Sequence, residues 1–165
     1  MSVAEETFNY AKKICDIDCR QQFAEKRPGV DINAADEDGY TALMLAVLRP
    51  ELNKNNLVGL LLDLGADCDV ENNTGETALF MAIEDGLTFT VYQMLWLADK
   101  NFISSNGDSS LAVAKYFSSN MREIIPLMEA WGFVDTENPT TYEQSRDLLY
   151  YSEGCTTCGG SVCGK

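Results

Sequence analysis

The sequence predicts an all-α fold: a short solenoid of stacked helix pairs joined by hairpin-like turns. First, a turn followed by a helix start recurs along the chain, and its glycines, Gly39, Gly75 and Gly107, lie 36 and then 32 residues apart. Such a spacing is typical of solenoid repeats. Second, an apolar stretch with its own glycine stop separates these segments. Third, 45% of the residues are hydrophobic, which is enough to bury a continuous core.

Each recurring position has a physical role. The glycines stand where a turn needs a positive φ or a close backbone approach. A hydroxyl residue stands one position before each helix, where it can cap free N–H groups; these residues are Thr41, Thr77 and Ser109. A leucine and an alanine follow three residues apart, on the face that neighbouring repeats bury; the pairs are Leu43/Ala46, Leu79/Ala82 and Leu111/Ala114.

The pattern divides the chain into an array at 1–152 and a tail at 153–165. We expect a capping repeat at about 3–35, repeats at about 36–71, 72–103 and 104–134, and a closing helix at about 135–152. Two short amphipathic helices, carrying Phe8 and Phe23, make up the capping repeat. The closing helix begins with a capping box formed by Thr140 and Glu143. Insertions are expected at 49–55 and around 118–121.

The order of these signals resembles the ankyrin repeat over roughly residues 5–150. A turn ends in glycine, a Thr-x-Leu helix start follows, and a second helix closes with Gly-Ala-Asp, as at 57–67. The resemblance implies a projecting β-hairpin at each turn and two antiparallel helices behind it. This sequence departs from the family pattern at two positions of each repeat. Ala42, Ala78 and Ser110 replace the usual proline, and Met44, Phe80 and Ala112 replace the usual histidine.

The resemblance also implies that the array binds a protein through its hairpin tips and the exposed side of its first helices. Carried over by position, this surface comprises Glu37, Asp38, Tyr40, Leu48, Arg49, Asn73, Thr74, Glu76, Glu84, Asp85, Asn106 and Asp108. Tyr40 and Arg49 are the expected anchors, because tyrosine and arginine are enriched in binding hot spots. The alternative interpretation is that these residues are solvated turns without a partner.

The net charge of the chain limits the kinds of partner that it is expected to bind. The chain has 26 acidic and 12 basic residues, a formal net charge of −14. This balance argues against nucleic acid and anionic membranes, and favours a basic protein partner or simple solubility. No run approaches the roughly 18 apolar residues of a membrane span, and acidic residues stand where a signal peptide carries positive charge. We therefore expect a cytoplasmic protein, or one delivered into a host cytoplasm.

The sequence does not predict an enzyme. It contains no histidine, which removes the commonest general base and a common zinc ligand. It shows no nucleophile–base pair and no phosphate-binding loop, so we expect no catalytic residue, no cofactor and no metal in the array. The predicted function is that of a protein-binding adaptor, inhibitor or effector module.

A second candidate surface arises in the helix predicted at 87–97. Its core positions are Thr90, Val91, Met94 and Leu95, which leaves Phe89, Tyr92 and Trp96 on the outer face. Such a patch of aromatic residues calls for an explanation. Either it binds a partner or a second copy, or the insertions or Tyr150 and Tyr151 cover it.

The tail at 153–165 is rich in cysteine and glycine and is expected to be flexible. Cys155, Cys158 and Cys163 lack the fourth ligand that zinc usually requires. The tail is either inert, or the substrate of a modifying enzyme, or a site of metal or disulfide chemistry. If it is modified, the chain resembles precursors of ribosomally made peptides, and the array is the leader or carrier that the tail-modifying enzyme recognises.

Overall fold

The computed structural model describes residues 2–15, 31–49, 57–117 and 121–136. The second helix of the capping repeat, the 49–55 insertion beyond Arg49, the closing helix beyond Thr136 and the whole tail lie outside these residues. Cys155, Cys158, Cys163, Tyr150 and Tyr151 are therefore not placed.

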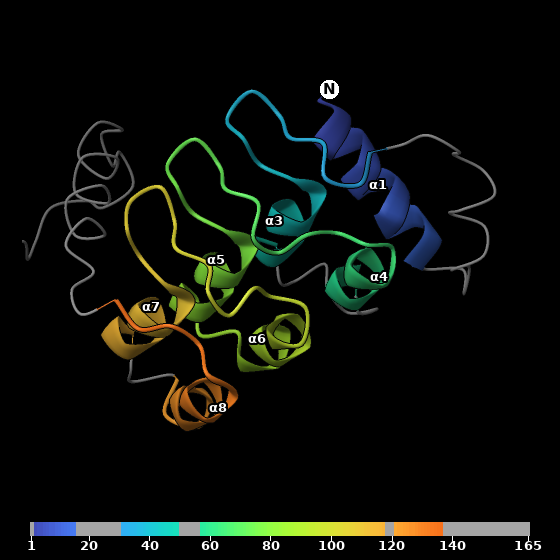
Figure 1. The fold of residues 1–165 in the computed structure, drawn as a ribbon. Helices are drawn as coiled ribbons and strands as arrows, with labels where there is room; N and C mark the ends of the chain where they lie inside the picture. Colours follow the sequence, from blue (N-terminus) through green and yellow to red (C-terminus); the bar gives the residue numbers. More distant parts are fainter. Residues whose placement is uncertain (1, 16–30, 50–56, 118–120, 137–165) are drawn as a thin grey trace, which may run out of the picture.

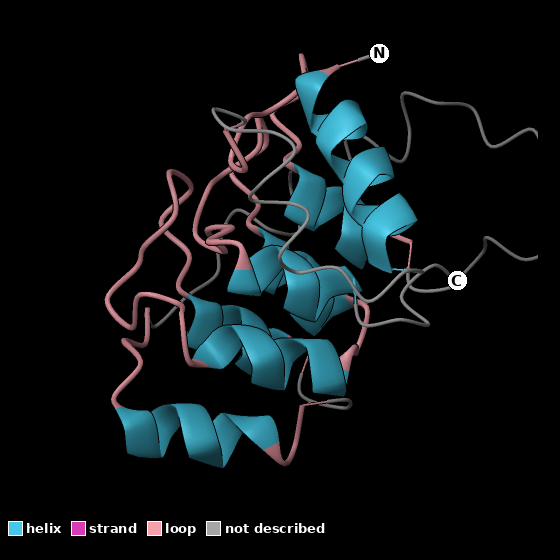
Figure 2. Cartoon of the chain, turned by 90° about the vertical axis from the view of Figure 1, so that its right-hand side faces the viewer, coloured by secondary structure: helices cyan, strands magenta, loops and turns pink. Residues whose placement is uncertain are grey.

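The described residues form an all-α array, as predicted. Its helices are α1 (Val3–Cys15), α3 (Ala42–Val47), α4 (Leu57–Asp63), α5 (Ala78–Glu84), α6 (Thr88–Leu95), α7 (Ser110–Tyr116) and α8 (Ile124–Trp131). The first helices of the repeats, α3, α5 and α7, lie side by side in one row, and the second helices, α4, α6 and α8, form another (Figure 1). The hairpin loops gather on one side of the stacked helices (Figure 2).

Hydroxyl caps start each of the first helices at the predicted residue. The Oγ1 of Thr41 accepts a hydrogen bond from the amide of Met44 at 3.4 Å, and that of Thr77 accepts one from Phe80 at 3.2 Å. Ser109 caps α7 in the same way. Each cap satisfies an amide that has no partner within its helix, which stabilises the helix by ~1 kcal/mol.

The core runs continuously through the repeats. Leu43 and Leu79 are fully buried, and the small side chains of Ala46, Ala82 and Ala114 let the first helices approach closely. Every residue of α3 is buried, because the helix lies between α1, α4 and α5. Among the second helices, α4 buries all its residues except Asp63, whereas α6 and α8 each bury one face. Burial is thus shared between neighbours, which is why a single repeat cannot fold alone.

The turns between repeats are narrow hairpins. Isolated antiparallel bridges pair Ala35 with Thr41, Glu71 with Thr77 and Ile103 with Ser109. The turn glycines have φ of +86° at Gly39, +78° at Gly75 and +89° at Gly107, as predicted from their place in the pattern.

Gly39 also meets its neighbour at close range. A Cβ at this position would lie 2.7 Å from the backbone nitrogen of Asn73 and 2.8 Å from the Cα of Asn72. At Gly107 the same added atom would meet nothing within 4 Å. Two glycines of almost equal φ therefore differ in one respect: Gly39 also makes room for the next hairpin.

This difference predicts unequal costs for two alanine substitutions. Gly107→Ala should destabilise the protein by ~1 kcal/mol, the cost of placing a side chain at positive φ. Gly39→Ala should cost about 2–4 kcal/mol, because backbone atoms must also move apart. Urea unfolding followed by circular dichroism measures both free energies. Equal losses would show that neighbouring hairpins do not depend on this close approach.

Candidate protein-binding surface

A polar side chain at the start of each hairpin holds the loop in shape. The Oδ1 of Asp36 accepts hydrogen bonds from the backbone amides of Asp38 at 3.1 Å and Tyr40 at 2.8 Å. Asn72 makes the equivalent pair of bonds in the second hairpin, and the Ser104 hydroxyl accepts one in the third. Such local bonds satisfy turn amides and stiffen the loops.

Asparagine side chains join each hairpin to the next. Asn73 donates its backbone N–H to the carbonyl of Asp38 at 3.1 Å and its side-chain Nδ2 to that of Glu37 at 2.8 Å. Asn106 donates its Nδ2 to the carbonyl of Thr74 at 2.7 Å. Both amides were predicted partner contacts. In the structure they position the hairpins against one another.

The remaining predicted contact residues differ in how accessible they are. Exposed residues are Glu37, Asp38, Leu48, Arg49, Asn73 and Asp85; partly exposed ones are Tyr40, Thr74, Glu76, Glu84 and Asn106. Asp108 is only 1% exposed. The expectation that Asp108 faces a partner is therefore wrong, because Asp108 is buried inside the third hairpin.

The two expected anchors already have partners within the chain. Tyr40 packs against the core. Burial raises the pKa of its hydroxyl, and the negative charge of Glu76 raises it further, whereas a hydrogen bond with Asn72 lowers it. Its hydroxyl therefore stays protonated at neutral pH. The guanidinium of Arg49 lies 5.1 Å from the centre of the Phe8 ring, a cation–π contact with the N-terminal helix.

Glu76 is likewise held within its own hairpin. Its Oε2 accepts a hydrogen bond from the Asn72 Nδ2 at 3.0 Å and lies 3.0 Å from the Thr74 hydroxyl. The carboxylates of Glu37, Asp38 and Asp85 are more accessible than that of Glu76. The accessible residues of the hairpins and first-helix ends are named the inner surface. They are Glu37, Asp38, Tyr40, Leu48, Arg49, Asn73, Thr74, Glu76, Glu84, Asp85 and Asn106.

The aromatic patch lies on the second helices. Phe89 and Trp96 are 68% and 76% exposed, whereas Tyr92 packs partly against the core. The four core positions predicted for this helix are buried. The Trp96 ring meets that of Trp131 in α8, with centroids 4.4 Å apart. Part of the patch thus packs on the following repeat.

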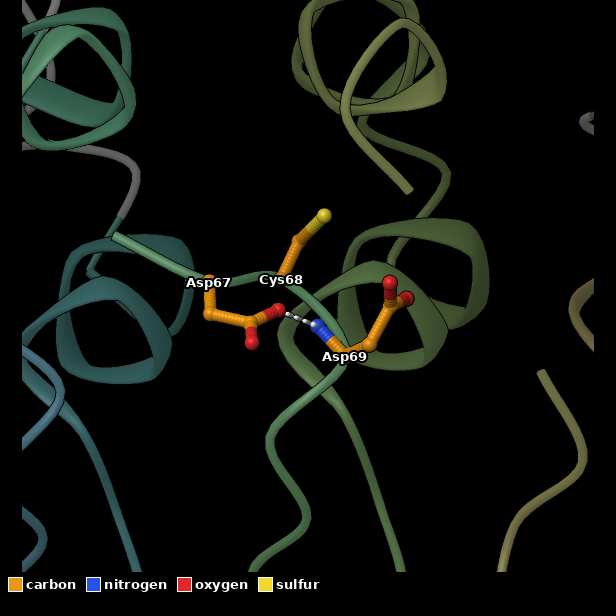
Figure 3. Close-up of side chains that lie close together, drawn as sticks. All are labelled: Asp67, Cys68 and Asp69. Carbon is orange, nitrogen blue, oxygen red and sulfur yellow. Dashed lines mark hydrogen bonds between the residues drawn. The ribbon is translucent and has the colours of Figure 1, made fainter. Parts of the chain in front are cut away.

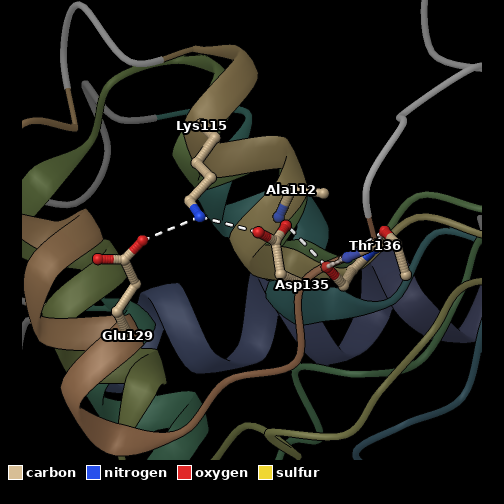
Figure 4. A network of polar contacts seen from close by, with 6 residues as sticks. Ala112, Lys115, Glu129, Asp135 and Thr136 are labelled. Carbon is tan, nitrogen blue, oxygen red and sulfur yellow. Dashed lines mark hydrogen bonds and ion pairs between the residues drawn. The ribbon is translucent and has the colours of Figure 1, made fainter.

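Lys115 links three segments near the end of the described array. Its Nζ lies 2.9 Å from an oxygen of Glu129 in α8 and 2.8 Å from one of Asp135 (Figure 4). The hydrogen bonds that its ammonium donates to these carboxylates, first to Asp135 and then to Glu129, raise the pKa of Lys115. Close by, Thr136 and Ser109 exchange hydrogen bonds of 3.1 and 3.3 Å. No sequence signal indicated this network, because the earlier repeats bury apolar residues at the position of Lys115.

Asp67, Cys68 and Asp69 bring three possible metal-ligating atoms within 4.8 Å of one another (Figure 3). All three side chains have structural partners instead, the Cys68 thiol donating to the Met94 carbonyl at 4.0 Å. The Asp67 carboxylate accepts the Asp69 amide at 2.9 Å, and that of Asp69 accepts the Asp99 amide of the next repeat at 2.6 Å. Cys68 is buried, which raises the pKa of its thiol to about 12 and keeps it protonated. These contacts build the repeat and do not define a metal centre.

Asp69 nevertheless has an unusual environment. Burial raises its pKa from 3.8 to about 6, and the nearby carboxylates of Asp67 and Asp99 add to the rise, while the bond from the Asp99 amide opposes it. At neutral pH the chain therefore holds a half-buried carboxylate that is ionised against its surroundings. That charge lowers stability.

Comparisons with known proteins agree with this architecture. The family model described as ankyrin repeat matches residues 38–73. Ankyrin repeat protein 14 of Vaccinia virus is 38% identical over 65 residues, which cover 39% of this chain and 26% of that protein. A putative ankyrin repeat protein of Acanthamoeba polyphaga mimivirus is 27% identical over 122 residues, 72% of each chain.

Fold and surface together define an α-helical repeat protein of the kind that serves as a protein-interaction module. The repeats have the ankyrin-repeat fold, and one of them matches the family model over residues 38–73. The chain spans about a quarter of the length of the Vaccinia virus relative. No helix among the described residues is long and apolar enough to cross a membrane.

The Asp69 environment predicts a pH-dependent gain from Asp69→Asn. The folded pKa of about 6 lies above the unfolded value of 3.8, so the folded state binds more protons between these values. Stability therefore falls as pH rises from about 4 to 6. The asparagine keeps an oxygen for the Asp99 amide and removes the charge. Asp69→Asn should raise the unfolding free energy at pH 7.5 and lose this advantage near pH 4.

Urea titrations at the two pH values measure the effect, with the exposed Glu37→Gln as control. Glu37→Gln should change the unfolding free energy by a similar small amount at both pH values. A gain from Asp69→Asn that is equal at pH 4 and pH 7.5 would contradict the assignment.

Proposed function

We propose that the chain is an adaptor, inhibitor or effector that engages a basic protein with its inner surface. The observation that carries this proposal is a set of accessible carboxylates: Glu37 and Asp38 on the first hairpin and Asp85 at the end of α5, elements that the fold holds in fixed positions. These are the elements through which the family resemblance implies binding.

Electrostatics support a basic partner. The formal net charge of −14 attracts cationic surfaces and speeds their encounter, and added salt weakens this attraction. Rigidity supports binding too. Hydrogen bonds within and between the hairpins fix the loops before a partner arrives, so that association orders few further residues.

The setting of this function is part of the proposal. We propose that the protein acts in a cytoplasm, its own or that of a host. Two features support this: the buried, unpaired thiol of Cys68, which is compatible with a reducing compartment, and relatives that are encoded by viruses. The alternative, a carrier for a modified tail, depends on Cys155, Cys158 and Cys163, outside the described residues.

Photocrosslinking from two positions tests whether the inner surface binds a protein. A photoreactive residue replaces Glu37 on a hairpin tip or Phe89 on the outer helix face, and crosslinking is carried out in cells. We expect a defined adduct from position 37 and a weaker one or none from position 89. For the isolated partner, Glu37→Gln with Asp38→Asn should lower the association rate about tenfold at low salt.

The thermal midpoint of the double variant serves as the folding control, since both side chains are exposed. Adducts confined to position 89, or an association rate unchanged by the double variant, would contradict the proposal.

A further inference from the structure

The first helices of three successive repeats end with exposed or partly exposed residues in the same register. Leu48, Glu84 and Tyr116 each stand seven residues after the hydroxyl that caps their helix. Leu48 and Tyr116 are 45% and 47% exposed, and Asp85, next to Glu84, is exposed as well. We name Leu48, Glu84, Asp85 and Tyr116 the end row. It presents an apolar residue, two carboxylates and a second apolar residue along neighbouring helices.

Among the described residues, the two cations adjacent in sequence to the end row have partners within the chain. Arg49 stacks over Phe8 of α1, and Lys115 is held between Glu129 and Asp135. Neither α3 nor α5 has a basic residue in its last turn. The partial negative charge of these helix ends thus adds to that of the carboxylates. The exposed carboxylate of Asp85, at the centre of the end row, therefore favours a cationic ligand.

An aromatic contact shapes one end of the row. The ring of Tyr116 meets that of Phe117 edge to face, with centroids 5.0 Å apart. Paired rings of this kind are stiff and present a large apolar area. Leu48 supplies a smaller apolar contact at the other end.

We propose that the end row binds an amphipathic basic helix, whose arginine or lysine side chains face Asp85 and whose apolar residues cover Leu48 and Tyr116. The inference rests on the proposed function and specifies the partner. Packed helices lie about 8–10 Å apart, so two repeats separate the apolar ends by about 16–20 Å. On a helix that rises 1.5 Å per residue, apolar residues eleven positions apart match this span.

A designed peptide tests the pattern directly. The probe is an alanine-based helix of about 16 residues with leucines at its third and fourteenth positions and arginines at its seventh and tenth, which share one face. The control peptide has the same composition in scrambled order. Fluorescence anisotropy with the full chain should show affinity for the patterned peptide at least about tenfold higher than for the control.

Matched variants locate the binding site. Asp85→Asn, Leu48→Ala and Tyr116→Ala should each weaken binding about fivefold or more. Glu123→Gln at the start of α8 and Trp96→Ala on the outer face should stay within about twofold, and Asp38→Asn on a hairpin tip is measured in parallel. Asp85→Arg should lose the arginine peptide and bind one with glutamates in place of the arginines. Thermal midpoints show that every variant is folded.

Any of three results would overturn the proposal that the end row binds a basic helix. The patterned and scrambled peptides bind equally or not at all, the end-row variants have no effect, or Trp96→Ala alone weakens binding. Loss caused by Asp38→Asn alone would overturn the end row but support a basic ligand at the hairpins. Crosslinking from position 37 decides the proposed function independently of the peptide.

Discussion

The close contact between neighbouring hairpins is the constraint on which the array depends. Gly39 leaves room for the backbone of Asn72 and Asn73, and Asn73 then donates both its backbone and side-chain N–H groups to the preceding hairpin. A side chain at Gly39 would occupy the space that makes these bonds possible. Because each repeat touches only its neighbours, such local contacts set the register of the stack and, with it, the alignment of the first helices.

The same contacts determine which side chains remain accessible to a partner. Asn73 and Asn106 use their amides between hairpins, and Asp108 lies buried. What is left accessible is mainly negative charge and a few apolar side chains at the first-helix ends. The fold therefore divides polar residues between two tasks. Asn73 and Asn106 fix the loops, whereas the accessible carboxylates of Glu37, Asp38 and Asp85 give the inner surface its negative charge.

Much of the fold could be predicted from the sequence, because its signals repeat and are local. Turn glycines, capping hydroxyls and the leucine–alanine spacing each reflect a backbone requirement within a single repeat. Contacts between repeats are different. The Lys115 network, the Asp69 bond to Asp99 and the stacking of Arg49 on Phe8 join residues far apart in sequence. The Asp69 bond has a counterpart in the preceding repeat, where Asn33 accepts the Asp67 amide, but the contacts of Lys115 and Arg49 follow no shared spacing. Only the three-dimensional arrangement shows that these two cations are used internally.

Amide hydrogen exchange measured by NMR tests the central claim, that bonds between repeats hold the array as one unit. The backbone amides of Asn73, Asp67 and Asp99 donate across repeats. We expect them to exchange as slowly as amides in the core of α5, through unfolding of the whole array. Exchange as fast as that of exposed loop amides would contradict the claim, because the repeats would then open independently.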